Sequence, residues 1–314
     1  MAPLPSYAIV LSTYNGSAFL ADQIESIRAQ TEPNFRLYIR DDGSTDGTLD
    51  LIARFAALDA RIAVVSDSAG NVGAPASFGL LLAHAFAREE AYVFLSDQDD
   101  VWLPHKAARM LGAARHHERW DGPHLPLLVH SDLRVVSSDL GEIHRSFFAY
   151  QQLDPTEDAQ PTRLLFRNAV TGCATLVNRA LLERALPFPG VAMHDWWLAQ
   201  CAATFGRIVF VDEATVLYRQ HGTNAFGARG VLGTVIQSLG APRKGARYFL
   251  AALDHLWELR RRCATAEPPP PAALQYLLDD LHRALTSNGT TASQRLRAAR
   301  GCAVRSGPHD RRTG

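Results

Sequence analysis

Four short apolar runs in the first hundred residues alternate with segments of helical periodicity, and this alternation restricts the fold more than any other feature of the chain. The runs are Tyr7–Leu11, Phe35–Ile39, Ile62–Val65 and Tyr92–Leu95. Short apolar runs that end in polar residues or glycine are typical of buried parallel strands. Repeated strand–helix units therefore predict an α/β fold with a mostly parallel central sheet flanked by helices.

Three of these runs end in polar sequences of an unusual kind. Ser12–Asn15 follows the first run, Asp41–Asp42 the second and Asp97–Asp100 the fourth. Ligands of parallel sheets bind beyond the carboxyl ends of the strands, so these three segments are expected to meet at one crevice. Turn formation and helix capping account for Ser44–Asp46 but leave the pair Asp41–Asp42 unexplained.

The fourth run leads into three carboxylates within four residues, Asp97, Asp99 and Asp100, and then into Trp102. Carboxylates this close repel one another unless a cation lies among them. A hard divalent cation takes oxygen ligands and bridges to phosphates, which predicts a cation site here. A solvated acidic turn is the simpler alternative, and the preceding strand and the second acidic turn disfavour it.

The second half of the chain adds two candidate segments. Ala169–Val177 is expected to be a strand, and Gly172 at its centre indicates the close approach of a ligand or of backbone. Asp195 opens a helical segment and could simply cap it. Its neighbours His194, Trp196 and Trp197 favour a sugar pocket, although the two indoles could equally belong to the core.

The remaining strands and loops are less regular. The segment 127–136 predicts a longer strand with a hairpin through 137–141, 151–162 predicts a loop, and 207–211 and 214–217 predict two short strands. His221 follows Arg219 in a glycine-containing loop. It could contact phosphate or metal, and an ordinary surface histidine is an equal alternative.

Charge is divided unevenly along the chain although its 314 residues have no net charge. Residues 1–239 hold 19 Lys and Arg against 26 Asp and Glu, whereas residues 240–314 hold 13 against 6. Leucines at helical spacing before and after Pro268–Pro271 predict a helical hairpin packed on the α/β domain, with a poorly ordered tail from Ser287. The basic part is either a solvated helical face or a contact for an anionic membrane surface.

Several classes of protein are disfavoured. The four cysteines lack paired spacing, which argues against a disulfide framework and a zinc site. With no leader pattern and no apolar run of roughly 20 residues, a cytoplasmic protein is expected, and no nucleic-acid partner. The motifs of P-loop proteins, dinucleotide folds and serine hydrolases are missing.

With these motifs placed, the chain resembles the inverting nucleotide-sugar glycosyltransferases of family 2, which have the GT-A fold. The resemblance covers roughly residues 6–226 and rests on Ser12–Gly16, Asp41–Thr48, Ser96–Trp102, His194–Trp197 and Tyr218–His221. The forms Asp97–Trp102 and Met193–Trp197 are most similar to the bacterial rhamnosyltransferase branch. The implied organisation is a GT-A domain over 1–226 and a helical extension over 227–314.

The resemblance also implies roles for single residues. Nucleotide-sugar contacts fall to Ser12, Thr13, Tyr14, Asn15, Asp41, Asp42 and Asp97, with Tyr14 stacking on the base and Asp42 bonding to it. Asp195 matches the catalytic base. Mg²⁺ or Mn²⁺ would be held by Asp99 with support from His221. The sugar or acceptor pocket would comprise Trp102, Thr171, Gly172, His194, Trp196 and Trp197.

The expected function is therefore a metal-dependent inverting glycosyltransferase that moves rhamnose from dTDP-rhamnose to a hydroxyl of a cell-surface polysaccharide or lipid-linked glycan precursor. A lipid-linked acceptor would place it on the inner face of the membrane. One alternative is a sugar nucleotidyltransferase, which usually needs a basic glycine-rich loop near the N-terminus; here no Lys or Arg precedes Arg28. The other is an inactive glycan-binding protein, disfavoured because every charged motif position is present.

Overall fold

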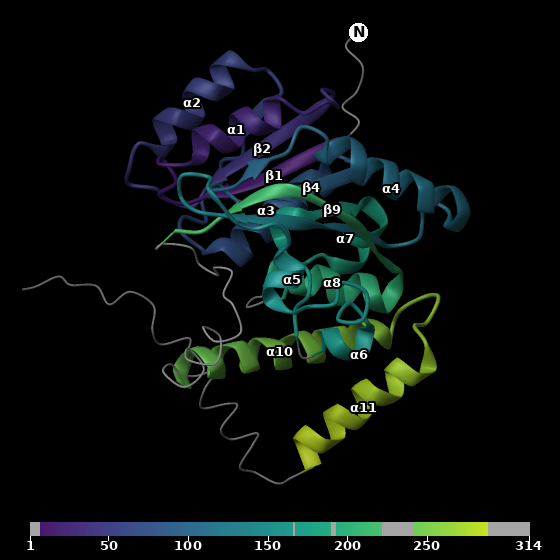
Figure 1. The fold of residues 1–314 in the computed structure, drawn as a ribbon. Helices are drawn as coiled ribbons and strands as arrows, with labels where there is room; N and C mark the ends of the chain where they lie inside the picture. The colour runs from purple at the N-terminus through teal and green to yellow at the C-terminus, as the bar shows by residue number, and fades with distance from the viewer. Residues whose placement is uncertain (1–6, 166, 190–192, 222–241, 288–314) are drawn as a thin grey trace, which may run out of the picture.

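The computed structural model describes residues 7–165, 167–189, 193–221 and 242–287 (Figure 1). Its first part alternates as predicted: β1 (Tyr7–Thr13), α1 (Leu20–Arg28), β2 (Phe35–Asp41), α2 (Thr48–Leu58), β3 (Ile62–Val64), α3 (Ala74–Ala87) and β4 (Tyr92–Ser96). These four strands are parallel and lie in the order β3-β2-β1-β4. The α/β class is confirmed, and the carboxyl ends of β1, β2 and β4 open on the same edge.

The sheet becomes mixed beyond β4. The later elements are β5 (Val101–Trp102), α4 (Lys106–Asp121), β6 (Leu127–Val136), β7 (Glu142–His144), α5 (Phe147–Gln151), α6 (Pro161–Leu164), a 3-10 turn η1 (Gly172–Ala174), β8 (Thr175–Asn178), α7 (Arg179–Ala185), α8 (His194–Phe205) and β9 (Arg207–Arg219). Strand β8 is antiparallel to both β4 and β6, whereas β9 is parallel to β6. Strand β9 runs back to the edge of the sheet where Asp97–Asp100 follow β4, here called the acidic edge, and it pairs there with β5.

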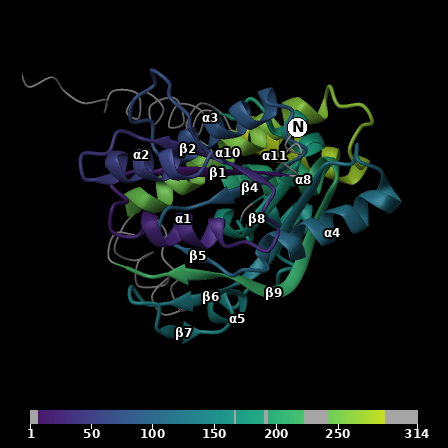
Figure 2. The ribbon, with the colours of Figure 1, turned by 90° about the horizontal axis from the view of Figure 1, so that it is seen from above.

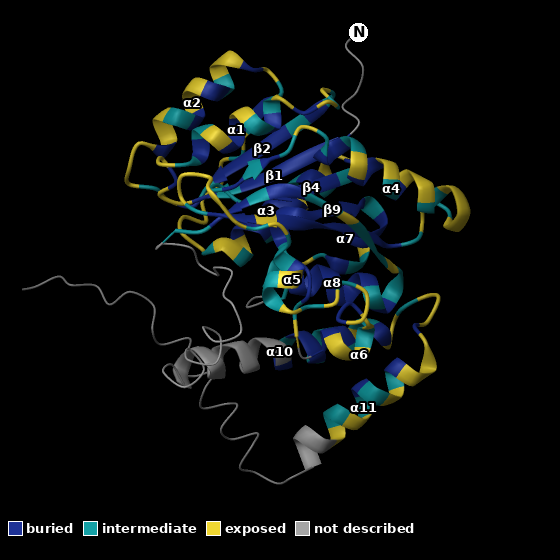
Figure 3. Cartoon of the chain, viewed as in Figure 1, coloured by how far each residue is buried: buried dark blue, intermediate teal, exposed yellow. Residues whose placement is uncertain are grey.

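Alternation along β1 divides the core into two layers, which Figure 3 shows as the dark interior of the sheet. Ala8 and Val10 face a layer that includes α3, α7 and α8, and Tyr7, Ile9 and Leu11 face a layer with α1, α2 and α4. A strand places successive side chains on opposite faces, so a run that is apolar throughout needs helices on both sides. Figure 2 shows α3 and α1 on opposite sides of the strands.

Two long helices follow, α10 (Pro242–Cys263) and α11 (Ala272–Ser287), with the predicted proline run between them. Leu253, Leu256 and Leu259 of α10 are buried in the layer that contains α8. The boundary expected at 226/227 and the tail after Ser287 lie outside the described residues. Among the described residues, no helix combines the length and the apolar character needed to cross a bilayer.

Two strand predictions are corrected. Ala169–Val177 is not one strand, because residues 172–174 form a 3-10 turn in which Ala174 N donates to Thr171 O at 3.0 Å, and β8 begins only at Thr175. The segments 207–211 and 214–217 are one strand, β9. Its pairing with β6 shifts register beside Asp132, so the polar interruption at Asp212–Glu213 is accommodated without ending the strand. The predicted hairpin is present, with β7 antiparallel to β6.

Candidate functional site

The polar ends of the first strands lie together, as their pairing requires. Leu11 pairs with Ser96 and Thr13 with Asp41, so the segments after β1, β2 and β4 begin side by side. Gln98 joins two of them: its Oε1 accepts hydrogen bonds from Thr13 Oγ1 at 2.6 Å and from Tyr14 N at 2.8 Å. Asn15 Oδ1 accepts from Thr45 N at 2.8 Å. The Tyr14 side chain remains 48% exposed at this edge, free to contact a flat ligand.

Asp41 holds the turn after β2. Its Oδ2 accepts from Gly43 N at 3.0 Å and Ser44 N at 2.8 Å, and its Oδ1 accepts from Ser44 Oγ. Turn formation therefore does explain this carboxylate, contrary to the sequence argument that set the pair 41–42 apart. A direct contact between Asp41 and a nucleotide would compete with these three hydrogen bonds.

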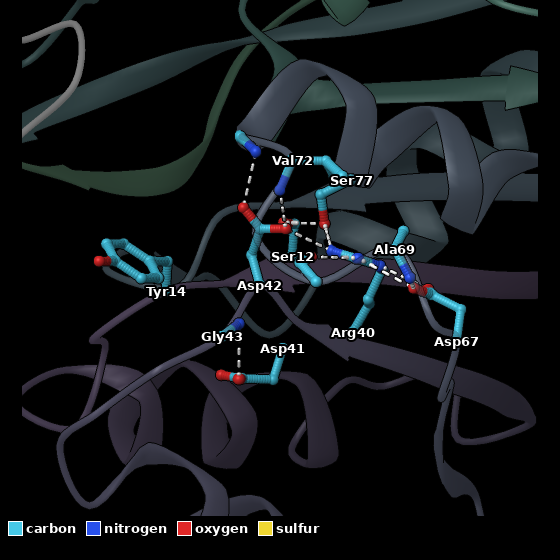
Figure 4. A network of polar contacts seen from close by, with 12 residues as sticks. Ser12, Tyr14, Arg40, Asp41, Asp42, Gly43, Asp67, Ala69, Val72 and Ser77 are labelled. Atoms are coloured by element: carbon cyan, nitrogen blue, oxygen red, sulfur yellow. Dashed lines mark hydrogen bonds and ion pairs between the residues drawn. The ribbon is translucent and has the colours of Figure 1, made fainter. Parts of the chain in front are cut away.

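Asp42 is buried and belongs to a charged network (Figure 4). Its Oδ1 accepts from Arg40 Nη1 at 2.6 Å and from Val72 N at 2.9 Å, and its Oδ2 accepts from Gly73 N at 2.8 Å. Ser12 reaches the same network by donating its hydroxyl to Ser77 Oγ at 2.7 Å. The sequence analysis did not predict a role for Arg40 or Ser77. Neither residue belongs to a recognisable motif, because one is a charged residue inside a strand and the other is a serine in a helix.

The acidic turn after β4 is joined to the end of β9. Asp99 Oδ2 lies 2.8 Å from His221 Nε2, which pairs the two residues assigned to the metal. Arg219 donates its backbone N–H to Asp100 Oδ1 at 3.1 Å and its Nε to the Asp99 carbonyl at 2.9 Å. The guanidinium also lies over the Phe19 ring, 4.7 Å from its centroid. Residues from β4, β9 and the loop before α1 thus fix the turn.

Repulsion and burial act on the carboxylates together. Burial, followed by the charges of Asp100, Asp99 and Asp195, raises the pKa of Asp97 well above its ordinary value. Burial and the charge of Asp99 raise the pKa of Asp100 to about 7. Asp100 Oδ2 is buried and accepts no hydrogen bond from any described residue. Unbalanced negative charge and an unsatisfied buried oxygen are what a cation would relieve.

Lys106 and Cys173 lie beneath this turn and were not predicted. Lys106 is fully buried, donates from Nζ to Cys173 O at 2.9 Å, and lies 4.6 Å from the centroid of the Trp102 ring. Burial lowers the Lys106 pKa to about 7. Ligand atoms of Asp97, Asp100 and Cys173 all lie within 4.8 Å of one another. Burial raises the pKa of the Cys173 thiol, so the oxygens of the turn are the better ligands.

Asp195 occupies the first turn of α8 and is 8% exposed. Its Oδ1 accepts from Trp196 N at 2.7 Å. A Cβ at Gly172 would lie 3.5 Å from Asp195 Cβ, and Gly172 precedes Cys173, which neighbours Asp97 and Asp100, so this carboxylate lies near the acidic turn. Its charge contributes to the raised pKa of Asp97. His194 stacks on Phe78 with ring centroids 4.0 Å apart. A Cβ at Gly172 would come within 2.7 Å of His194 Nε2, so the glycine expected to allow a close approach admits this imidazole.

The three tryptophans assigned to a sugar pocket are core residues instead. Trp102 is 2% exposed, and Trp196 and Trp197 are fully buried. Trp196 Nε1 donates to Leu164 O at 2.6 Å and Trp197 Nε1 to Ala185 O at 2.8 Å. With neither face open, none of them can stack on a sugar ring. These indoles anchor the first turn of α8 and the floor of the acidic turn, while Thr171 stays partly exposed beside Gly172.

Solved structures share this fold. Staphylococcus aureus TarS 1–349, in complex with UDP-GlcNAc, aligns with a TM-score of 0.58 at 17% identity, covering 90% of this chain and 74% of that one. The mannosyltransferase PcManGT from Pyrobaculum calidifontis, in complex with GDP-Man and Mn²⁺, aligns with a TM-score of 0.54 at 18% identity, covering 98% and 77%. Both likenesses concern the GT-A fold.

Sequence comparison places the chain more narrowly. The profile of Glycosyl transferase family 2 matches residues 8–123, and this part of the chain is a family 2 glycosyltransferase domain. The dTDP-rhamnosyl transferase RfbG of Shigella flexneri is 26% identical over 228 residues, which are 69% of this chain and 74% of that protein. EpsH of Bacillus subtilis, a putative glycosyltransferase by name, is 30% identical over 225 residues, 69% of this chain and 61% of that protein.

Proposed function

We propose that this protein transfers rhamnose from dTDP-rhamnose, with inversion at the anomeric carbon, to a hydroxyl of a cell-surface polysaccharide or lipid-linked glycan precursor. The observation that carries the proposal is the meeting of acidic side chains from two distant segments at the turn Gly172–Ala174. Cys173 has its ligand atom within 4.8 Å of those of Asp97 and Asp100, and a Cβ at the neighbouring Gly172 would lie 3.5 Å from Asp195 Cβ. The name of the Shigella relative supports rhamnose and dTDP as the donor. The family 2 domain and the GT-A fold support transfer from a nucleotide-sugar in general.

The donor is proposed to lie along the edge formed by β1, β2 and β4. In this proposal the ring of Tyr14, which is 48% exposed, stacks on the base, and Ser12 and Asp42 contact the nucleoside. Asp99, with His221 at 2.8 Å, would hold a divalent cation together with oxygens of the neighbouring turn. When bound, Mg²⁺ or Mn²⁺ supplies charge neutralisation of the diphosphate leaving group.

Asp195 is proposed as the general base. One of its oxygens is held by the amide of Trp196, and Oδ2 accepts no hydrogen bond from the described residues, so it can accept the proton of the acceptor hydroxyl. Proton removal by such a group accelerates transfer roughly 10²–10⁴-fold. The acceptor oxygen attacks the anomeric carbon as the bond to the diphosphate breaks, and this single displacement inverts the configuration.

A screen of nucleotide-sugars tests the proposal. The purified protein is mixed with dTDP-rhamnose, UDP-sugars and GDP-sugars, with and without Mn²⁺, and the release of nucleoside diphosphate and the shift in melting temperature are measured. The largest stabilisation is expected from dTDP-rhamnose with Mn²⁺. Release of pyrophosphate in a parallel assay with dTTP and a sugar 1-phosphate would point instead to a nucleotidyltransferase. Binding of glycan without metal-dependent nucleotide binding would contradict the enzyme function.

A peripheral membrane position is proposed on the same basis. A lipid-linked acceptor must be met at the bilayer surface, and many of the basic residues of the C-terminal part lie after Ser287, outside the described residues. Sedimentation with vesicles of anionic and of zwitterionic lipid tests this contact. Binding to anionic vesicles that decreases with salt is expected, and equal recovery in the supernatant with both lipids would contradict it.

A further inference from the structure

Arg40 is the least expected residue near the nucleotide side of the site, because it is a charged side chain only 2% exposed. Its Nε donates to Asp67 Oδ2 at 2.7 Å, and its Nη2 donates to Asp67 Oδ1 at 3.1 Å and to Gly70 O at 2.8 Å. Its Nη1 donates to Asp42 Oδ1 at 2.6 Å and to Ser77 Oγ at 3.0 Å. Guanidinium has five N–H groups, so every donor is used and the orientation of the side chain is fixed.

The hydrogen bonds from Arg40 and from two backbone amides occupy most of the acceptor positions of the Asp42 carboxylate. Each carboxylate oxygen offers about two acceptor positions. On Oδ1 both are used, by Arg40 Nη1 and by Val72 N, and on Oδ2 one is used by Gly73 N. One acceptor position on Oδ2 therefore remains. A ligand that approaches Asp42 can be recognised through a single hydrogen-bond donor and not through two parallel ones.

We propose that Arg40 is a positioning residue that makes Asp42 selective for a nucleotide base with one ring N–H, uracil or thymine, over guanine. Guanine presents two adjacent donors, its ring N–H and its amino group, which suit both oxygens of an open carboxylate. Uracil and thymine present one N–H between two carbonyl oxygens, which suits a carboxylate with one oxygen already occupied. This inference rests on the proposed function, in which Asp42 contacts the base.

The surroundings of Arg40 keep the arrangement rigid (Figure 4). Asp67 Oδ1 also accepts from Ala69 N at 2.8 Å, so the loop after β3 is tied to the guanidinium. Ser77 brings in α3 and, through Ser12, the end of β1. Lysine at position 40 would keep the charge but could not reach Asp42 and Asp67 at once, since an ammonium lacks the planar fork.

The test compares Arg40→Lys with a matched control, Arg61→Lys. Arg61 also holds a carboxylate, Asp59, with Nη2 at 2.7 Å from Oδ2, and it lies over Phe35 at the opposite end of β2. Calorimetry with dTDP, UDP and GDP in the presence of Mn²⁺ gives the dissociation constants. The wild type is expected to prefer dTDP and UDP over GDP. In Arg40→Lys this preference should decrease roughly tenfold or more, as expected when a hydrogen bond to a charged group is misplaced.

The outcomes separate the two proposals. Absence of nucleoside diphosphate binding by the wild type overturns the proposed function and this inference with it. An unchanged preference in folded Arg40→Lys overturns the inference alone. Preference for GDP by the wild type overturns the inference and the proposed dTDP donor, but leaves transfer from a nucleotide-sugar in place. The preference for dTDP and UDP over GDP could also decrease equally in Arg40→Lys and in Arg61→Lys. A general loss of rigidity would then explain the effect, and the inference about Arg40 would be overturned. If Arg40→Lys does not fold, Asp67→Asn, which releases the guanidinium from its other partner, gives the same comparison.

Discussion

Asp41 and Asp42 are sequence neighbours with the same side chain, yet their carboxylates have different partners. Asp41 accepts from the amides of its own turn, and Asp42 is bonded to Arg40 and to the amides before α3. Alternation along an extended segment turns adjacent side chains in opposite directions, so each meets a different part of the chain. The motif shows that acids gather at this edge, but the partner of each acid is set by loops that are distant in sequence.

Replacing Asp195 by Asn tests the assignment of the base. The amide keeps the shape of the side chain but cannot take up a proton, so transfer should fall by roughly 10²–10⁴-fold. Donor binding should change little, because the acceptor and not the nucleotide meets this group. Steady-state transfer and calorimetric binding of the donor product are the two measurements.

Asp50→Asn is the control for that variant, because Asp50 also lies in the first turn of a helix, on the exposed side of α2. It should leave both quantities unchanged. Full transferase rate in folded Asp195→Asn would contradict the assignment.

Replacing His221 by Asn tests the metal assignment. His221 Nε2 lies 2.8 Å from Asp99 Oδ2, and the ring packs on Phe19 with centroids 4.7 Å apart. Loss of a residue that ligates or orients a ligand of a metal typically lowers metal affinity about 10–100-fold, and Mn²⁺ binding should weaken by this factor. Titration followed by electron paramagnetic resonance measures it. His84→Asn, at a ring that contacts Tyr38, serves as the control, and equal Mn²⁺ affinity in all three proteins would exclude the role.

At the scale of elements, the first half of the fold follows from the sequence and the second half does so less completely. Runs such as Tyr92–Leu95 are apolar throughout because helices cover both faces of the strand. A continuous apolar run can be recognised from neighbouring residues alone, so these strands were predictable. The turn at Gly172–Ala174 has strand-like composition, and the close approach of His194 on α8 to Gly172 is a tertiary contact that the local sequence does not reveal. The continuity of β9 depends on pairing with β6, which no local pattern reports.

Helix α10 supports the helix that carries Asp195, and His255 is its point of contact. The imidazole is fully buried, 5.1 Å from the Trp196 ring centroid and 5.6 Å from that of Trp197. Neither ring nitrogen has a hydrogen-bond partner among the described residues, so the ring acts as an apolar wedge. His255→Ala should leave a cavity beneath α8 and reduce the free energy of unfolding by about 2–4 kcal/mol.

His255→Phe is the matched variant, because it keeps a ring between the indoles and removes two unsatisfied nitrogens. Its stability should be close to that of the wild type or higher. Urea unfolding gives both values, and transfer assays far below the unfolding midpoint show whether His255→Ala also lowers kcat. Tyr276→Ala on α11, where the side chain is 70% exposed, should stay within about 0.5 kcal/mol of wild type. A loss for His255→Ala no larger than that would contradict the wedge.

For the whole molecule, the meeting of the polar strand ends was predictable and the buried charges beside them were not. Polar motifs at three strand ends indicated one crevice, since the carboxyl ends of parallel strands share an edge. The buried cations Arg40 and Lys106 carry no such signal, because a Lys or Arg in sequence is normally a surface residue. The indoles of Trp196 and Trp197 were placed in the pocket because an aromatic residue beside an acid does not reveal which side of a helix is covered.

Buried histidines give the molecule a pH dependence whose sign can be derived. Burial lowers the pKa of His130, on β6, to about 3, and that of His255 to about 4. In the unfolded chain both groups titrate near the ordinary value of about 6.5, so acid protonates the unfolded state first. Their contribution to stability is complete above about pH 6.5 and decreases as the pH falls toward the folded values. Asp97 and Asp100 act in the opposite direction, because their folded pKa values are raised.

Replacing His130 separates its contribution to the pH dependence of stability from the contributions of the other buried groups. His130 lies between Phe148 and Phe210, with ring centroids 5.8 Å and 5.2 Å away, so His130→Leu should be accommodated. Between pH 7 and pH 5 the wild type should lose about 2 kcal/mol of unfolding free energy through His130, and the variant should lack this loss. Urea unfolding at the two pH values measures the difference. His124→Leu, at an exposed histidine, should keep the pH dependence of the wild type. An unchanged dependence in His130→Leu would mean that His130 is protonated in the folded protein or that its surroundings admit water.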